Sequence, residues 1–372
     1  MKRSFSILCH EKTKEKNIEH FLSQLKANTT KVPTLILFSS DSDNFSFYST
    51  ILHNLFPSAQ IIGSTSYVMF CDDGNDYSGL SVFCVTEGVE CTSGVILNIQ
   101  RNPMKFKKVI QDAVDSLSEK TNTCCFEVTT AFSNSEELVL DTFESVLGKN
   151  YIPLLGTSAG GNYENPNTMV SLNGKVFDEA CVFVLIHNLK GKITLYKENL
   201  YKPMNQFFTA TDVDCDKRIV YEYDSIPAAD FLSNKYDIPK NKLFDFLKEH
   251  PLGKILGDEV HVTEIDKINE NGSIAYFSKI FKMTKLSLLE QGDMYKEWRQ
   301  TTLAVKSKVP EPSFNIIVNC CSRISFYSSK NELDSFFNLL KNEYGTYIGF
   351  SGFGEQFNYT HLNQTMVLAA FE

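Results

Sequence analysis

Three segments of this 372-residue chain repeat one pattern, and the repetition restricts the fold more than any other feature. Each segment begins with a short apolar strand, continues into a helix with an apolar stripe, and ends in a second strand that finishes with glycine and hydroxyl residues. The second strands cover residues 61–65, 154–158 and 347–351. A strand, a helix and a strand within about 30 residues have the size of a βαβ unit. We therefore expect parallel strand pairs joined by right-handed crossovers.

Start signals mark two of the three predicted helices. Ser133 and Glu136 have the spacing of a capping box, and so do Ser329 and Glu332. Apolar side chains then recur at helical intervals within residues 138–147 and 333–340. These patterns predict helices that begin at the two capping boxes and pack one face on a sheet.

Further strands follow one another too closely for helices to separate them. They are expected at residues 79–85, 168–172, 176–188 and 193–200, with a hairpin turn at Asn173-Gly174. Antiparallel strands thus join the parallel pairs. The predicted fold class is α/β, with internally repetitive strand-helix-strand units that form mixed sheets in two domains.

The length of the chain favours two domains, because a single core seldom grows beyond about 250 to 300 residues. The strand pattern stops at the short polar segment 212–217. We place the boundary there, which gives an N-terminal domain of residues 25–211 and a C-terminal domain of residues 212–372.

Charge and cysteine content exclude several classes of protein. The chain has 36 Lys and Arg against 45 Asp and Glu, a net charge of −9, so nucleic acid is not an expected partner. No stretch is apolar enough for a bilayer-spanning helix or a signal peptide, and membrane insertion is not expected. Ten Cys without a CxxC pair, two pairs of them adjacent, favour reduced thiols in the cytoplasm and predict neither a metal nor a cofactor.

Five short motifs in the second half of the chain occur in an order that resembles a known family. They are residues 220–231, 251–253, 319–323, 349–356 and 363–365, and residues 62–66 and 156–160 add two more in the first half. From about residue 30 to its end the chain resembles the FIST sensory family. It departs from many relatives at Tyr67-Val68-Met69, where they have a Gly-Glu pair.

The resemblance implies a sensory protein that binds a small polar ligand, with amino acids among the candidates. FIST regions are commonly joined to signalling output modules, but none follows here. A separate signalling protein is therefore the expected partner.

Two charged residues in these motifs could bind the charged groups of an amino acid. Arg323 follows an apolar strand in a chain with only five Arg, and its guanidinium could hold a carboxylate in bidentate fashion. The carboxylate of Glu355 could hold the ammonium group. The alternative is that Arg323 and Glu355 pair with each other to tie two strands together.

The remaining candidate ligand contacts flank turns near these two charges. They are Cys320, Gly354, Asn363, Gln364 and Thr365. Gly354 permits close approach of the backbone, and the polar side chains offer hydrogen bonds. The alternative is that the polar residues only satisfy their own loop backbone.

Two other function classes compete with the sensor. One is an enzyme that acts on a small polar substrate through Cys320 or through the region of Glu355 and His361. The other is a structural subunit that binds only protein. We expect no catalytic residue, because the His residues form no local pattern that would supply a base to Cys320.

We predict that all ten Cys are thiols. Titration of the denatured, non-reduced protein with a thiol reagent should recover ten groups per chain, because adjacent Cys are poorly placed to bridge. Recovery of only a few groups would contradict the prediction.

Overall fold

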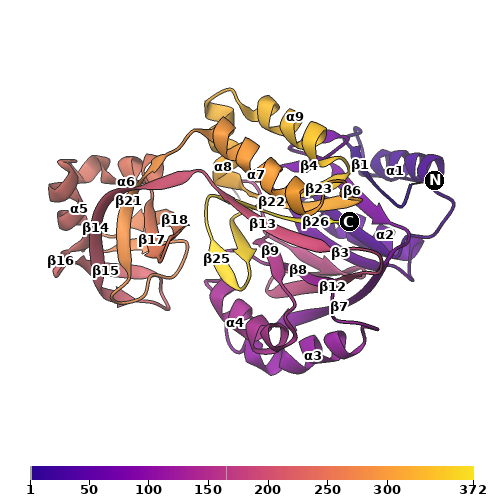
Figure 1. Cartoon of the computed structure of the whole chain (residues 1–372), viewed down its shortest axis with the longest axis horizontal. Helices are drawn as coiled ribbons and strands as arrows, with labels where there is room; N and C mark the ends of the chain where they lie inside the picture. The colour runs from indigo at the N-terminus through magenta and orange to yellow at the C-terminus, as the bar shows by residue number, and fades with distance from the viewer. Residues whose placement is uncertain (1, 165) are drawn as a thin grey trace. The chain divides into compact units, whose positions relative to one another are not determined.

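The structure is a computed structural model in which residues 2–164 and 166–372 are described. Helices cover sheets that contain both parallel and antiparallel strands (Figure 1), which confirms the predicted α/β class. In the described part of the chain, no helix is long and apolar enough to cross a membrane. All ten Cys carry free thiols.

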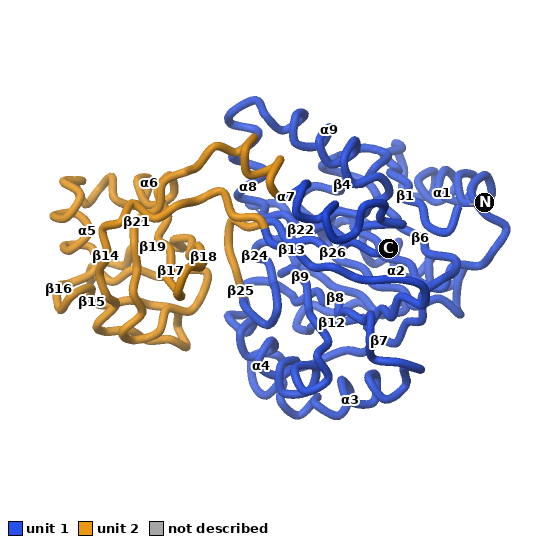
Figure 2. The backbone as a smooth tube through the Cα atoms, in the orientation of Figure 1, with its two compact units in different colours: residues 1–197, 301–360, 366–372 blue, residues 198–300, 361–365 orange. Residues whose placement is uncertain are grey.

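The chain forms two compact units, which Figure 2 distinguishes by colour. Unit 1 contains the chain up to residue 197 together with residues 301–360 and 366–372, and unit 2 contains residues 198–300 and 361–365. All three strand-helix-strand repeats lie in unit 1, and the polar segment 212–217 lies in a hairpin of unit 2. These units divide the chain by contact, whereas the boundary at residues 211/212 is placed where the predicted strand pattern stops, and it stays a prediction.

The first repeat builds a sheet in which only β2 and β3 are parallel. Its strands, in spatial order, are β1 (Ser4–Cys9), β6 (Leu80–Val85), β2 (Leu35–Ser40), β3 (Gln60–Thr65), β10 (Val170–Leu172) and β11 (Lys175–Phe177). Helices α1 (Lys14–Asn28) and α2 (Phe45–Leu55) bury their apolar faces in a core shared with this sheet. The predicted Asn173-Gly174 turn joins β10 to β11, with both residues at positive φ.

The second repeat supplies the parallel pair β8 and β9 of another sheet. Its strands, in order, are β25 (Thr360–Leu362), β24 (Gly354–Phe357), β9 (Leu154–Ser158), β8 (Thr123–Thr129), β12 (Ala180–Asn188) and β7 (Val89–Leu97). The helical segments beside it are η1 (Pro103–Phe106), α3 (Lys107–Asp115), α4 (Glu136–Leu147) and η2 (Gly148–Asn150). Helices α3 and α4 share one apolar core with the strands.

The third repeat supplies the parallel pair β22 and β23. The strands of its sheet, in order, are β13 (Ile193–Asn199), β26 (Thr365–Phe371), β22 (Phe314–Cys320), β23 (Tyr347–Gly352), β4 (Met69–Cys71) and β5 (Gly74–Asp76). Its helices are α8 (Cys321–Ser329) and α9 (Leu333–Tyr344), and α7 (Met294–Lys308), which precedes β22, has residues in both units. The ring of Phe337 on α9 packs against Phe70 on β4 at 5.4 Å, so the third repeat holds a strand that follows the first.

Unit 2 has its own sheet and core. Its strands, in order, are β18 (Glu259–Thr263), β17 (Leu252–Leu256), β21 (Lys285–Gln291), β14 (Tyr201–Asp214), β15 (Ile219–Tyr223), β20 (Ile274–Tyr276) and β19 (Ile265–Ile268), with β16 (Ile226–Pro227) paired to β15. Helices α5 (Ala228–Tyr236) and α6 (Lys240–Glu249) complete the core.

Three local predictions were wrong. Strand β22 ends at Cys320 and α8 follows at once, so a helix was missed where the sequence suggested only a strand end. The N-caps of α4 and α9 are Ser135 and Glu332, without side-chain cap bonds, and the hydroxyls of Ser133 and Ser329 donate to nearby carbonyls instead. The expected strand at residues 176–188 is two strands, β11 and β12.

The carboxyl ends of the three parallel pairs are joined directly to one another inside unit 1. The Tyr67 amide donates to the Ser351 carbonyl at 2.9 Å, which links the first repeat to the third. The Gly160 amide donates to the Thr65 carbonyl at 3.0 Å, which links the second repeat to the first. Each repeat therefore completes the backbone hydrogen bonding of another.

Two glycines allow this close approach. A Cβ on Gly160 would overlap the backbone oxygen of Ser351, and one on Gly352 would overlap the side chain of Thr157. Only residues without a side chain let the repeats come this close.

We predict that Gly160→Ala strongly destabilises unit 1, by about 1 to 3 kcal/mol or more, because its methyl group meets backbone that can move only with the third repeat. Chemical denaturation of the full chain would measure the change.

The matched control is Gly161→Ala. A Cβ there comes no closer than 3.7 Å to its nearest neighbour, so the free energy of unfolding should change little. Equal losses in the two variants would contradict the role given to Gly160.

Candidate functional site

Two polar side chains lie opposite each other where the strands of the third repeat end. Asn319 on β22 and Ser351 on β23 are in register, and both are fully buried. Neither the amide of Asn319 nor the hydroxyl of Ser351 has a hydrogen-bond partner within the described residues. Buried polar groups without partners are uncommon and require an explanation, such as a ligand.

The position of this pair follows from the sequence of β22. Residues 314–318 are mainly apolar and buried, and the polar Asn319 comes only where the strand is about to end. Ligands of α/β proteins commonly bind at the carboxyl ends of parallel strands. The Asn319–Ser351 pair occupies such an edge.

Arg323 lies on the first turn of α8, directly after β22. It is 2% exposed, and Cys320, the N-cap residue of the helix, is buried as well. The guanidinium donates from Nη2 to the Tyr327 hydroxyl at 2.6 Å and lies 5.6 Å from the ring centroid. Tyr327, one turn further along α8, thus fixes the direction of the arginine side chain.

Glu355 lies on β24, which follows β23 after a single residue. Its side chain is fully buried, and in the ladder with β9 it stands opposite Thr157. Gly354 pairs with Ser158, and its carbonyl accepts from the Thr157 hydroxyl at 3.1 Å. Strand β24 is therefore anchored on the second repeat.

The two charged candidates occupy equivalent positions. Arg323 comes four residues after Asn319, and Glu355 comes four residues after Ser351. A buried charge requires compensation by charge or hydrogen bonds, because removal from water is costly. The segments that follow the two strand ends of the third repeat thus carry buried ionisable groups of both signs, each four residues after a buried amide or hydroxyl.

The remaining predicted contacts belong to unit 2. Asn363, Gln364 and Thr365 form the turn between β25 and β26, with Gln364 at φ 50°. The Thr365 hydroxyl donates to the Asn363 carbonyl at 2.9 Å, and the Asn363 side-chain oxygen accepts from the Glu264 amide at 3.3 Å. These bonds fit the alternative that the turn satisfies its own backbone.

His361, named with Glu355 for an enzymatic role, also lies in unit 2. Its Nε2 is 3.2 Å from the carbonyl oxygen of Phe277. Because a carbonyl can only accept, this nitrogen carries a proton and donates.

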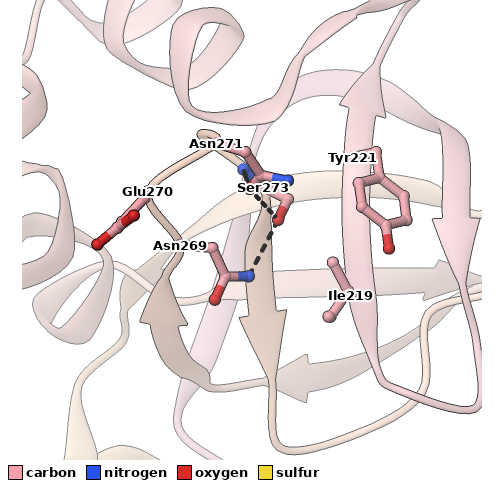
Figure 3. Close-up of a pocket in the computed structure, with 6 residues that line it drawn as sticks. All are labelled: Ile219, Tyr221, Asn269, Glu270, Asn271 and Ser273. Atoms are coloured by element: carbon pink, nitrogen blue, oxygen red, sulfur yellow. Dashed lines mark hydrogen bonds between the residues drawn. The ribbon is translucent and has the colours of Figure 1, made fainter.

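A surface depression of unit 2 contains none of the predicted site residues (Figure 3). It is lined by Ile219, Tyr221, Asn269, Glu270, Asn271 and Ser273. The Ser273 hydroxyl donates to Asn271 at 2.8 Å and accepts from Asn269 at 3.0 Å. These hydrogen bonds stabilise the turn between β19 and β20, so the polar groups that line the depression have a structural role in the turn.

A second buried carboxyl group, Glu127, lies in the middle of β8. Its Oε2 accepts from the Thr129 hydroxyl at 2.8 Å and from the Cys181 thiol at 3.1 Å, and Oε1 has no partner in the described chain. Burial, assisted by the negative charge of Glu136, raises the pKa of Glu127 to about 8. A Cβ on Gly156 would come within 2.5 Å of Oε1, so the glycine leaves room for the carboxyl group.

Sequence reasoning missed Asn319 and Ser351 as site residues although both stand in the quoted motifs. The available signal was a polar residue at the end of an apolar strand followed by a helix. In the described part of the chain, no group of three or more His, Cys, Asp and Glu side chains is placed to hold a metal ion.

Comparisons with known families cover nearly the whole chain. The model of the FIST N domain matches residues 34–225, and the model of the FIST C domain matches residues 228–358. No curated protein matches the sequence.

We predict that Glu127 makes stability depend on pH. Between its unfolded pKa near 4.5 and its folded pKa near 8, the folded protein keeps a proton that the unfolded chain has released. The free energy of unfolding therefore falls as pH rises through this range, by at most about 1.4 kcal/mol per pH unit. Glu127→Gln removes this dependence, so the variant should gain stability relative to the wild type from pH 5 to 8.

Denaturant titrations at several pH values would test this, with the exposed Glu270→Gln as the control. A constant difference between Glu127→Gln and the wild type across the range would rule out the protonated carboxyl group.

Proposed function

The chain belongs to the FIST family, and on that premise we propose that it senses an amino acid or a similar small polar metabolite and signals to a separate protein. FIST domains are regarded as sensory inputs that bind small ligands, and the family is sensory rather than catalytic. The observation that carries the proposal is the buried, unpartnered Asn319–Ser351 pair, whose two members are followed four residues later by Arg323 and Glu355.

Complementary charge favours a zwitterion as the ligand. The guanidinium of Arg323 matches a carboxylate, and the carboxylate of Glu355 matches an ammonium group. An amino acid would in addition use the amide of Asn319 and the hydroxyl of Ser351, which can each donate and accept.

The buried positions also favour a ligand over a surface ion pair. A solvent-exposed Arg–Glu pair contributes only about 0 to 1 kcal/mol to stability. An ion pair of that kind forms at the surface and does not explain why Arg323 and Glu355 are buried. If Arg323 and Glu355 paired only with each other, Asn319 and Ser351 would still lack partners.

The proposal keeps the finer assignments made from the sequence. Residues 25–211 and 212–372 are the FIST N-terminal-like and C-terminal-like domains, the chain acts in the cytoplasm, and Cys320 and Gly354 contribute to the ligand site of unit 1. Ten free thiols support the cytoplasmic assignment.

We predict that Arg323→Lys weakens ligand binding by about 1.5 to 3 kcal/mol, the range for a hydrogen bond to a charged group, while stability changes little. Lysine keeps the charge but loses the bidentate fork. A thermal-shift screen of the amino acids would identify the ligand, and calorimetry would measure the affinity. The exposed Arg101→Lys is the matched control.

Ser351→Ala separates a ligand role from a structural one. Because the hydroxyl has no partner in the described chain, its removal should leave the ligand-free protein as stable as before. Ligand affinity should fall by about 1 kcal/mol. Wild-type affinity in both Arg323→Lys and Ser351→Ala, or no amino acid that stabilises the protein, would refute the proposed site.

A further inference from the structure

Five aromatic rings from distant parts of unit 1 form one continuous series, which we call the aromatic strip. Its members in order are Tyr77, Tyr67, Tyr163, Phe353 and Phe132. Neighbouring ring centroids are 5.6, 5.0, 5.6 and 4.8 Å apart. These separations are typical of aromatic pairs in contact.

The strip reaches the protein surface. Tyr77 is 50% exposed, and Phe132 and Tyr163 are each 49% exposed. Its rings come from the loops after β3, β5, β8, β9 and β23, so the same convergence of repeats that forms the buried site also gathers the rings. Single exposed apolar side chains are ordinary, but a contiguous exposed group commonly marks an interaction site.

Phe132 adds a second, independent sign of function. Its φ of 61° lies in the left-handed region, which a bulky residue adopts only at an energetic penalty. The loop is held by a hydrogen bond from the Ala131 amide to the Thr168 hydroxyl at 3.2 Å. Burial does not account for a phenylalanine here, because half of the side chain remains exposed.

The charged residues in the segments that carry the strip are all acidic. The segments that carry its rings, residues 66–79, 130–137, 159–168 and 352–354, contain no Lys or Arg. Asp76 directly precedes Tyr77, and the exposed Glu164 directly follows Tyr163. Aromatic faces attract cations, and nearby carboxylates strengthen that attraction.

From these observations we propose that the aromatic strip binds a segment of another protein that carries Lys or Arg side chains. The strip extends over five rings and is open to solvent, which suits an extended chain better than a small organic cation that needs an enclosing cage. Basic side chains would lie on the exposed faces of Tyr77, Tyr163 and Phe132. This inference rests on one part of the proposed function, namely that the chain signals to a separate protein.

Selection of random twelve-residue peptides on the full-length protein tests the proposal, followed by fluorescence anisotropy with the selected peptides. We expect the peptides to be enriched in Lys and Arg and to lose affinity when these are replaced by Gln. Phe132→Gly should weaken binding about fivefold or more, because it removes a ring face, while relief of the positive φ keeps the protein stable. Tyr77→Ser should have a similar effect on binding.

Tyr151→Gly is the matched control, since Tyr151 is also an exposed aromatic residue at positive φ, 54°, but lies outside the strip. This variant should bind the peptides like the wild type. The proposal is overturned if no peptide is selected, if the peptides lack basic residues, or if Phe132→Gly binds as tightly as the wild type. Tetramethylammonium binding without peptide binding would likewise overturn it and assign the strip to a small cation.

The peptide assay contains no amino acid, so its outcome is independent of the ligand site. Phe132→Gly should retain any amino-acid-induced rise in melting temperature, because Phe132 is not among the ligand contacts. If Phe132→Gly loses peptide binding but is still stabilised by the amino acid, the change affects the strip and not the ligand site.

Discussion

Unit 1 depends on the close approach of three backbones at the carboxyl ends of its parallel strands. The amides of Tyr67 and Gly160 complete hydrogen bonds that no single repeat can complete by itself. Glycine at positions 160 and 352 makes the approach possible, because a side chain at either position would occupy the volume of the neighbouring repeat. Each repeat has its own helices and apolar face, and these contacts join the three into one unit together with the pairing of β23 with β4 and of β24 with β9.

The same convergence explains why polar and charged side chains are buried in one place. A hydroxyl residue lies at or next to the end of the second strand of each repeat, and Arg323 and Glu355 follow the strands of the third. Such groups would be expensive in an apolar core, yet they are tolerated where backbone amides and carbonyls of several strand ends supply partners. Sites for small polar molecules commonly contain a few precisely placed polar groups, and these strand ends supply such groups.

Most of the local structure could be predicted from the sequence, because periodicity and turn residues act over short distances. The parallel pairs, α2, α4, α9 and the Asn173-Gly174 turn follow from such patterns. Helix α8 was missed because its nine residues are rich in serine and carry a weak apolar stripe. The two capping boxes did not form because the hydroxyls of Ser133 and Ser329 donate to preceding carbonyls, an alternative that spacing alone does not exclude.

The site could be predicted only in part. Arg323 and Glu355 were identified from the family motifs. That Asn319 lies opposite Ser351 depends on the register of two strands, and the aromatic strip depends on loops that are distant in the sequence coming together in the fold. Neither of these is encoded in a local pattern.

The order of segments in the sequence has a consequence for synthesis of the chain. Unit 2 is inserted between the second and third repeats, so the ribosome completes residues 1–197 and then 198–300 before the last part of unit 1 emerges. Until then the Ser351 carbonyl that accepts from the Tyr67 amide does not exist, and strand β4 has no β23 to pair with. The nascent first half therefore presents an unpaired strand edge, which favours wrong association between chains and slow, non-local closure. Unit 2 has a core of its own and can therefore fold during this interval, before the third repeat arrives.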